Sequence, residues 1–187
     1  PIEQLAIFWA QPNFITFRPA DTTETAAGWY TALTRENTPV GMILSRQGLP
    51  NLEGTSREAL KGGYIVKKEK KDLELILIGT GSELQLVYEA AKILEEKNIG
   101  VRVVSMPSMD LFEEQSREYK EEILPKNIRK RIAVEAGSSF GWHKYVGLEG
   151  KIIAMESFGA SAPATQLFEK FSFTVENVVK TAEELIK

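Results

Sequence analysis

The sequence has no cysteine and only one histidine, His143, among its 187 residues. The lack of cysteine excludes disulfides, thiolate zinc sites and thiol nucleophiles, and it fits a cytoplasmic protein, since thiols stay reduced there. A single histidine excludes a two-histidine metal site and any relay between histidines. Because His143 stands among aromatic residues in GWHKYVG, we expect it to be packed or interfacial rather than catalytic.

An excess of positive charge and long apolar runs are also lacking. The 23 Lys and Arg residues face 26 Asp and Glu residues, so the net charge of -3 leaves no surplus to neutralise a nucleic-acid backbone. The apolar runs are far shorter than the roughly 20 residues that a membrane span needs. We therefore expect neither nucleic acid nor a membrane as a partner. The chain begins at Pro1 without a methionine, in a stretch typical of the middle of a domain, so we expect a piece of a longer protein.

What is present is 43% hydrophobic residues, enough for one large domain or two small ones. The first third predicts strand, helix, strand: Phe14 to Arg18 and Val40 to Leu44 read as short buried strands, and Pro39 ends the helix between them. An Asp21-x-x-Glu24 capping box begins that helix of about four turns. Its expected apolar face consists of Ala26, Trp29, Tyr30 and Leu33. This order is a βαβ unit.

The chain divides into two parts. Residues 51–72 have few core residues and a lysine-rich end, which predicts an interdomain linker with an edge strand as a candidate at Gly63 to Lys67. From residue 73 onward, LELILIG, VRVVSM, RIAVEAG and KIIAMES alternate with helical patterns. The predicted fold class is α/β: a remnant of a parallel βαβ domain in residues 1–50, then a doubly wound, mostly parallel sheet in residues 73–187.

Three helices of the second domain have local signals. A Ser82-x-x-Gln85 capping box is expected to begin the first, whose apolar stripe is Leu84, Val87, Ala91 and Leu94. One helix is expected from Asp110 to Leu124, where Pro125 ends it. Thr174 is expected to cap the last helix.

Several polar groups suggest chemistry but have a simpler explanation. Gly79-Thr80-Gly81 between a strand and a helix is the place for a phosphate, yet the rest of a dinucleotide fingerprint is missing, so a tight turn is favoured. Asp110, Glu113 and Glu114 are expected at a helix start, where carboxylates complement the dipole. Glu135 ends the strand RIAVE at a ligand-binding edge, but a hydrogen bond to a neighbouring loop is the favoured use.

Arg46 is the strongest candidate for a binding residue. It follows the apolar strand VGMIL, so its side chain projects from the carboxyl end of that strand, and its planar guanidinium can bind a phosphate through two parallel hydrogen bonds. From position alone a structural salt bridge is the more frequent use of such an arginine.

Read in order, several segments resemble the transketolase family over essentially the whole chain. They are PIEQLA, FRPADTTETAAGWYTAL, SRQGLP, GTGSELQL, VVSMPSMDLFEEQ, AVEAGSSFGWHKYVG and ESFGASAPATQLFEKFSFTVENVV. Each is weak alone, but the ordered set is specific. It favours transketolase over the related deoxyxylulose-phosphate synthases and dehydrogenase E1 components.

The resemblance implies that the chain is the end of the pyrimidine-binding domain followed by the C-terminal domain. It places Arg46 at the family arginine that binds the phosphate of a sugar-phosphate substrate, and no catalytic, cofactor-binding or metal-binding residue within this chain. Thiamine diphosphate and a divalent metal, Mg or Ca, are then expected in an intact homodimeric parent and not in this chain alone. Phe140, Trp142 and Tyr145 fit either a packing loop or the core. The competing hypothesis is a stand-alone binding or assembly module that uses GTGSE as an anion site.

Overall fold

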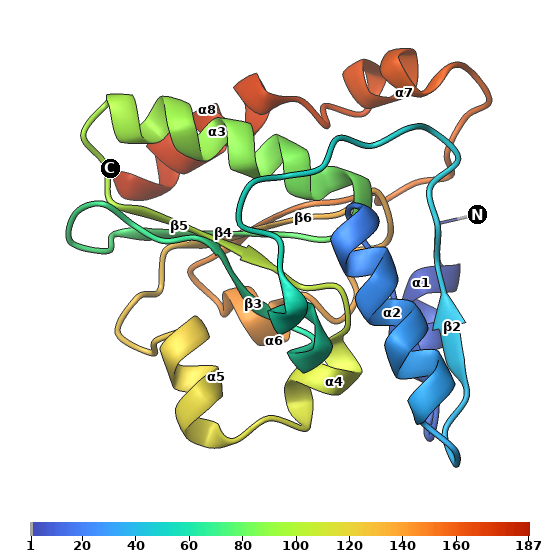
Figure 1. Ribbon diagram of the computed structural model, residues 1–187. Coiled ribbons are helices and arrows are strands. Elements are labelled where there is room, and N and C mark those ends of the chain that lie inside the picture. The colour runs from blue at the N-terminus through green and yellow to red at the C-terminus, as the bar shows by residue number, and fades with distance from the viewer. Residues whose placement is uncertain (1) are drawn as a thin grey trace.

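The computed structural model describes residues 2–187, and its centre is a five-stranded sheet (Figure 1). The strands are β3 (Tyr64–Lys67), β4 (Leu75–Gly79), β5 (Val101–Ser105), β6 (Arg131–Val134) and β7 (Lys151–Ile153). They lie in the order β3-β5-β4-β6-β7, all parallel except β3, which pairs antiparallel with β5. The predicted mostly parallel sheet is confirmed, and the candidate edge strand is indeed β3.

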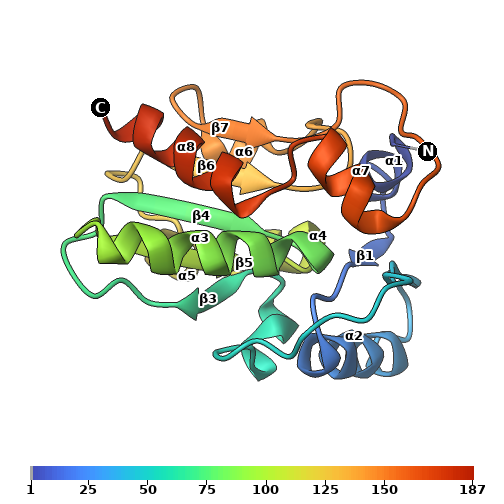
Figure 2. The ribbon, with the colours of Figure 1, turned by 90° about the horizontal axis from the view of Figure 1, so that it is seen from above.

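Helices cover both faces of this sheet, which makes it doubly wound. The helices α3 (Leu84–Glu96) and α8 (Val175–Ile186) lie side by side over one face (Figure 2). The opposite face carries α4 (Met109–Glu113), α5 (Arg117–Ile123) and α6 (His143–Val146). In β4, Leu75 and Leu77 join the apolar cluster under α3 and α8, while Ile76 and Ile78 join the other cluster. A strand buried on both faces must be apolar throughout, which explains the LELILIG pattern.

The local helix signals had mixed outcomes. All four predicted stripe residues of α3 are fully buried, and Thr174 caps α8 by accepting a hydrogen bond from the N–H of Asn177. The expected capping box at Ser82 is wrong: Gly81–Glu83 form a 3₁₀ turn, η2, and the hydroxyl of Ser82 donates to Glu83 instead. The side chains of this turn point to a buried arginine from elsewhere in the chain, which no local pattern encodes.

The single helix expected from Asp110 to Leu124 is also wrong. The segment forms α4 and α5, and Ser116 between them caps α5 by accepting a hydrogen bond from the N–H of Tyr119 at 3.1 Å. A serine hydroxyl that competes for backbone donors is a sufficient reason for the break. Short elements that no pattern predicted are α1 (Gln4–Trp9), η1 (Arg57–Lys61), α6 and α7 (Ala164–Lys170). In the described part of the chain, no helix is long and apolar enough to pass through a membrane.

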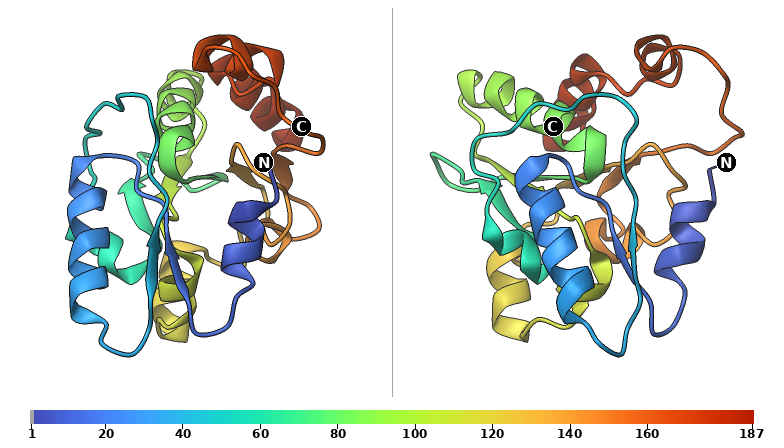
Figure 3. Two further views of the ribbon diagram at one scale, coloured as in Figure 1. Left: turned by 90° about the vertical axis from the view of Figure 1, so that its right-hand side faces the viewer. Right: turned by 45° about the vertical axis from the view of Figure 1, so that its right-hand side comes forward.

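The first part of the chain folds as the expected βαβ unit. Strands β1 (Ile15–Phe17) and β2 (Val40–Met42) pair in parallel, and α2 (Thr22–Thr34) connects them. Asp21 caps α2 by accepting from the N–H of Glu24 at 3.0 Å. These elements lie at one end of the large sheet (Figure 3). The N–H of Arg18, just past β1, donates to the carbonyl of Pro107, just past β5, at 2.7 Å.

The expected apolar face of α2 is not a core face. Trp29, Tyr30 and Leu33 are 53%, 57% and 80% exposed, and the buried side of the helix carries Glu24, Ala27, Gly28 and Thr31. Small residues are needed there, since a Cβ on Gly28 would lie 2.6 Å from the side chain of Met42 in β2. The two-stranded sheet covers only this small-residue side. Strand β2 is likewise half-buried rather than buried.

Candidate functional site

Arg46 lies in an exposed loop at the carboxyl end of β2. The strand ends at Met42, so the arginine is four residues beyond it rather than directly after the strand, as expected from VGMIL. Within residues 2–187 its guanidinium has no ion pair and no hydrogen bond. A structural salt bridge within this part of the chain is therefore wrong. An exposed fork of donors remains open to an anion.

Both ends of the Arg46 loop are fixed by segments next to α2. At the start, the N–H of Ile43 donates to the carbonyl of Phe17 at 2.9 Å, which extends the β1–β2 pairing by one bond. At the end, the N–H of Leu52 donates to Oδ2 of Asp21 at 3.1 Å. The tetrapeptide Arg-Pro-Ala-Asp after β1 therefore lies beside both the loop and the large sheet.

Arg18, the first residue of that tetrapeptide, fills the crevice at the carboxyl ends of β4 and β6. Its Nη1 lies 2.6 Å from Oε2 of Glu83 and 3.4 Å from Oε1 of Glu135, and it donates to the carbonyl of Thr80 at 3.1 Å. Arg18 is 7% exposed and both carboxylates are fully buried. After β4 the chain goes to β5 on one side of the sheet, and after β6 it goes to β7 on the other side. The crevice between β4 and β6 is therefore the point where a doubly wound fold ordinarily binds its ligand.

The Gly79-Thr80-Gly81 turn therefore serves packing. Gly81 has a φ of +53°, and a Cβ at this position would lie 2.8 Å from the guanidinium of Arg18. Glu83 follows in the same turn, and its carboxylate would repel a phosphate. The favoured reading of a tight turn is confirmed, and the anion site proposed for GTGSE is wrong.

Glu24 is a second buried carboxylate at the junction of the two parts. It accepts hydrogen bonds from the N–H of Ala20 at 2.7 Å, the hydroxyl of Ser105 at 2.6 Å and the hydroxyl of Tyr64 at 2.8 Å. Burial raises the pKa of Glu24 to about 7, although these donors oppose the shift. Through this one side chain, α2 is connected to β5 and to the edge strand β3.

Glu135 accepts from the indole N–H of Trp142 at 2.8 Å, which agrees with the favoured hydrogen bond to a neighbouring loop. Burial raises the pKa of Glu135 to about 7, against the effect of the Arg18 charge. Trp142 and Tyr145 are core residues, whereas Phe140 is 68% exposed, so both readings of this aromatic segment hold in part. His143 is exposed rather than packed.

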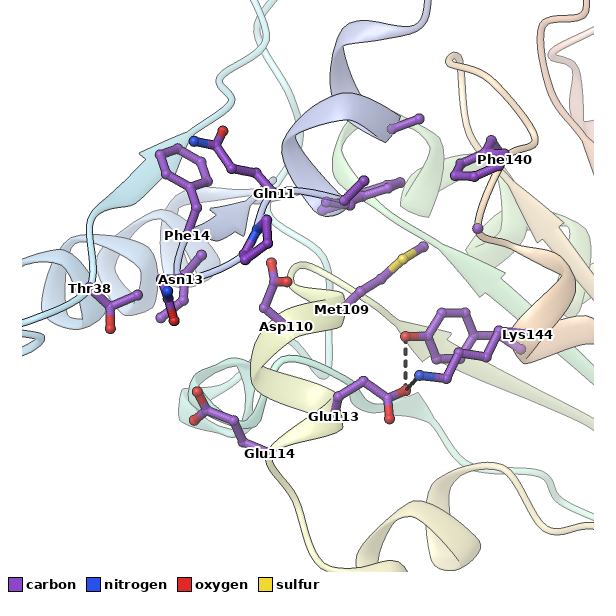
Figure 4. Close-up of a pocket in the computed structure, with 17 residues that line it drawn as sticks. Gln11, Asn13, Phe14, Thr38, Met109, Asp110, Glu113, Glu114, Phe140 and Lys144 are labelled. Carbon is purple, nitrogen blue, oxygen red and sulfur yellow. Dashed lines mark hydrogen bonds and ion pairs between the residues drawn. The ribbon is translucent and has the colours of Figure 1, made fainter.

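The three carboxylates near α4 have separate partners around a cavity of about 530 Å³ (Figure 4). Asp110, in the first turn, accepts from the N–H of Thr16 at 2.9 Å. Glu113 accepts from Tyr145, and Glu114 pairs with Arg35. The predicted dipole role fits Asp110 alone, since α4 ends at Glu113 and the other two carboxylates lie at its C-terminal end.

The residues present do not fit a diphosphate with its metal ion. In residues 2–187 no three His, Asp, Glu or Cys side chains come together in a way that could hold a metal. The glycine turn is filled by Arg18 and carries the negative charge of Glu83. We therefore assign no cofactor contact to these side chains.

Arg18, Glu24 and Glu83 were missed by the sequence reasoning as interacting groups. Their only signal was a charged residue next to an apolar segment: Arg18 ends FITFR, and Glu83 follows the strand LELILIG closely. Arg18 and Glu83 are 65 residues apart in the chain, and Glu24 is 40 and 81 residues from Tyr64 and Ser105, so spacing could not connect them.

Comparison with known proteins places both parts of the chain. Residues 1–51 match the family model for the transketolase pyrimidine-binding domain, and residues 62–174 match that for the transketolase-like C-terminal domain. A transketolase of Staphylococcus epidermidis is 50% identical over 189 residues, which cover 99% of this chain and 28% of that protein. The chain thus spans less than a third of the length of that relative.

Solved structures of transketolases also match this chain along nearly its whole length. A transketolase of Pichia stipitis in complex with sedoheptulose-7-phosphate has a TM-score of 0.93 and 41% identity, covering 100% of this chain and 27% of that one. A structure described as the split gene transketolase, inactive beta4 tetramer, has a TM-score of 0.82 and 25% identity, covering 99% of this chain and 62% of that one.

Proposed function

The chain belongs to the transketolase family, and we propose that it is the C-terminal part of an enzyme that moves a two-carbon ketol unit from a ketose phosphate to an aldose phosphate. Within that enzyme, the chain supplies Arg46 as a binding residue for the substrate phosphate. The observation that carries this role is that Arg46 is exposed on a loop anchored at both ends, and has no partner of its own in residues 2–187.

The expected contribution of Arg46 is to binding rather than to the chemical step. A phosphate is remote from the carbon–carbon bond that breaks, so an arginine that binds it stabilises the bound substrate and the transition state alike. Two parallel charge-assisted hydrogen bonds also fix the orientation of the sugar chain. The relative solved with sedoheptulose-7-phosphate supports a sugar phosphate as the ligand.

Thiamine diphosphate and a divalent metal, Mg or Ca, would be bound by parts of the enzyme outside residues 1–187. When bound, the cofactor supplies the carbanion chemistry of ketol transfer. Among residues 2–187 no group of side chains is placed to hold its diphosphate and metal, so we propose that the chain alone is inactive. The relative described as an inactive tetramer from a split gene supports this view. The exposed Trp29, Tyr30 and Leu33 on α2 fit burial in a larger, homodimeric cytoplasmic enzyme.

The experiment that tests the role of Arg46 is steady-state kinetics of Arg46→Ala in the full-length protein. We expect the KM for phosphorylated substrates to rise by about 100-fold, which corresponds to about 2.8 kcal/mol, and the KM for unphosphorylated ones to change by less than about twofold. Arg129→Ala removes another exposed arginine, one paired with Glu149, and serves as the matched control. Equal effects of Arg46→Ala on both substrate classes would remove the phosphate role.

Calorimetry tests the chain by itself. Titration of residues 1–187 with thiamine diphosphate and Mg²⁺ should give no binding heat at micromolar concentrations, and ketol transfer should be absent. Micromolar affinity would contradict the assignment of the cofactor site to other parts of the enzyme.

A further inference from the structure

The Arg46 loop has no internal hydrogen bonds to hold its shape. No backbone or side-chain hydrogen bond in the described chain involves any residue from 44 to 50. Arg46 and its neighbour Gln47 are exposed, so packing contributes little. The conformation of this segment is therefore set by its two ends, and whatever fixes those ends determines where the guanidinium lies.

Most of the hydrogen bonds that fix the second end are made by one carboxylate, that of Asp21. Its Oδ2 accepts from the N–H of Leu52 at 3.1 Å and from the hydroxyl of Thr55 at 2.6 Å. Its Oδ1 accepts from the N–H of Glu24, and through this bond Asp21 caps the N-terminus of α2. Asp21 is 5% exposed, so these bonds are little weakened by competition from water. In addition, the side chain of Asn51 accepts from the N–H of Thr22 at 3.3 Å.

The two oxygens of Asp21 thus have different tasks. Capping a helix requires one acceptor, and Oδ1 provides it. Oδ2 is not needed by the helix, yet it is the acceptor for both donors of the chain segment that follows the Arg46 loop. Because α2 is itself held to the large sheet through Glu24, Asp21 connects the loop to the five-stranded sheet.

We propose that Asp21 is a positioning residue for Arg46: through Oδ2 it fixes the end of the loop so that the guanidinium is ordered before the substrate phosphate arrives. This inference rests on the proposed function of Arg46. Without the Oδ2 bonds, the end of the loop is held only by the Asn51–Thr22 hydrogen bond and by the packing of Leu52 on the core, so a bound phosphate must order more of the segment. The effect should therefore fall on phosphate affinity and not on the chemical step.

The test uses the full-length protein and three substitutions. Asp21→Asn keeps Oδ1 for the cap but places an amide group opposite two donors. Thr55→Val removes one donor at nearly constant shape, and Thr55→Ser restores the hydroxyl. We expect the KM for phosphorylated substrates to rise by about tenfold in D21N and about threefold in T55V. The value of kcat, and the KM for unphosphorylated substrates, should stay within about twofold, and T55S should resemble the unmodified protein.

Thr174→Val is the matched control for loss of a helix cap, because Thr174 caps α8 on the large sheet. It should lower stability without changing selectivity for the phosphate. The inference is overturned if D21N and T55V raise the KM of both substrate classes equally, or if T55V leaves the selectivity for phosphorylated substrates unchanged. If D21N fails to fold, the result for T55V alone decides. Loss of selectivity in R46A but in neither D21N nor T55V removes only the role of Asp21. No selective effect in R46A removes the proposed function itself.

Discussion

Replacement of Arg18 by methionine should be the most damaging single change at the junction of the two parts. Methionine keeps much of the length of the side chain and removes only its charge and donors. The nearest carboxylate, Glu83, lies 2.6 Å from the guanidinium, and Glu83 and Glu135 are both fully buried. Removal of one partner from a buried ion pair leaves an uncompensated charge and costs about 3–5 kcal/mol. In a chain of this size, that loss lowers Tm by roughly 6–20 °C.

Urea denaturation followed by tryptophan fluorescence measures the loss, and Trp142 reports on the site because it donates to Glu135. Arg129→Met is the control: Arg129 pairs with Glu149 at 2.8 Å, but both side chains are more than half exposed, so the cost should be below about 1 kcal/mol. Adding Glu135→Gln to Arg18→Met should recover part of the loss, since the amide still accepts from Trp142 without a charge.

The pH dependence provides a second check on Arg18. Burial already raises the pKa of Glu135 to about 7, and removal of the adjacent positive charge should raise that pKa further. A carboxyl whose pKa is raised by folding binds a proton more readily in the folded state, so stability is highest at low pH and falls as the pH rises through the raised value. The cost of Arg18→Met should thus be smaller at pH 5 than at pH 8. A cost equal to that of Arg129→Met at pH 8, or a larger cost at pH 5, would refute the reasoning.

Two further predictions concern Glu24 at the same junction and Gly62 beside α4. Burial raises the pKa of Glu24 to about 7 from 4.5, so the free energy of unfolding should fall as the pH rises between these values. Glu24→Gln should make the free energy of unfolding depend less steeply on pH in urea titrations from pH 4.5 to pH 8. An unchanged pH dependence would contradict the assignment. Gly62 has a φ of +81°, and a Cβ there would lie 2.3 Å from backbone atoms of Ser108 and Phe112, so Gly62→Ala should cost more than about 1 kcal/mol. Gly48→Ala, with nothing within 4 Å of its Cβ, is the control for that substitution and should be nearly neutral in the same thermal unfolding assay.

Local patterns were sufficient wherever the local environment decides the structure. The stripe of α3 and the Thr174 cap of α8 were predicted correctly, because a helix that covers a sheet must repeat apolar residues with its own period and must satisfy its first N–H groups. The apolar strand β4 followed from the same reasoning, since burial on both faces leaves no place for alternation. The position of Arg46 after a strand was also visible, although the strand is shorter than its apolar letters suggest.

Patterns failed where a residue's partner comes from a distant segment. The aromatic side of α2 looks like a core face, but its small-residue side is the one that packs on β2, because Gly28 permits close approach. The turn at Gly81 looks like a phosphate site until Arg18 is found in it, 62 residues away from Thr80 in sequence. The periodicity of a sequence does not predict contacts between segments so far apart in the chain.

The sequence by itself therefore determined the alternation of strands and helices, the layers that this alternation must form, and the family resemblance. Only the tertiary structure decided what the charged groups do: Arg18 pairs with two buried carboxylates, whereas Arg46 has no ion pair within residues 2–187 and Asp21 binds the segment that follows its loop. The physical reason is that apolar burial follows from the short-range period of each element, while the fate of a charge depends on which opposite charge or donor the fold brings within about 3 Å of it.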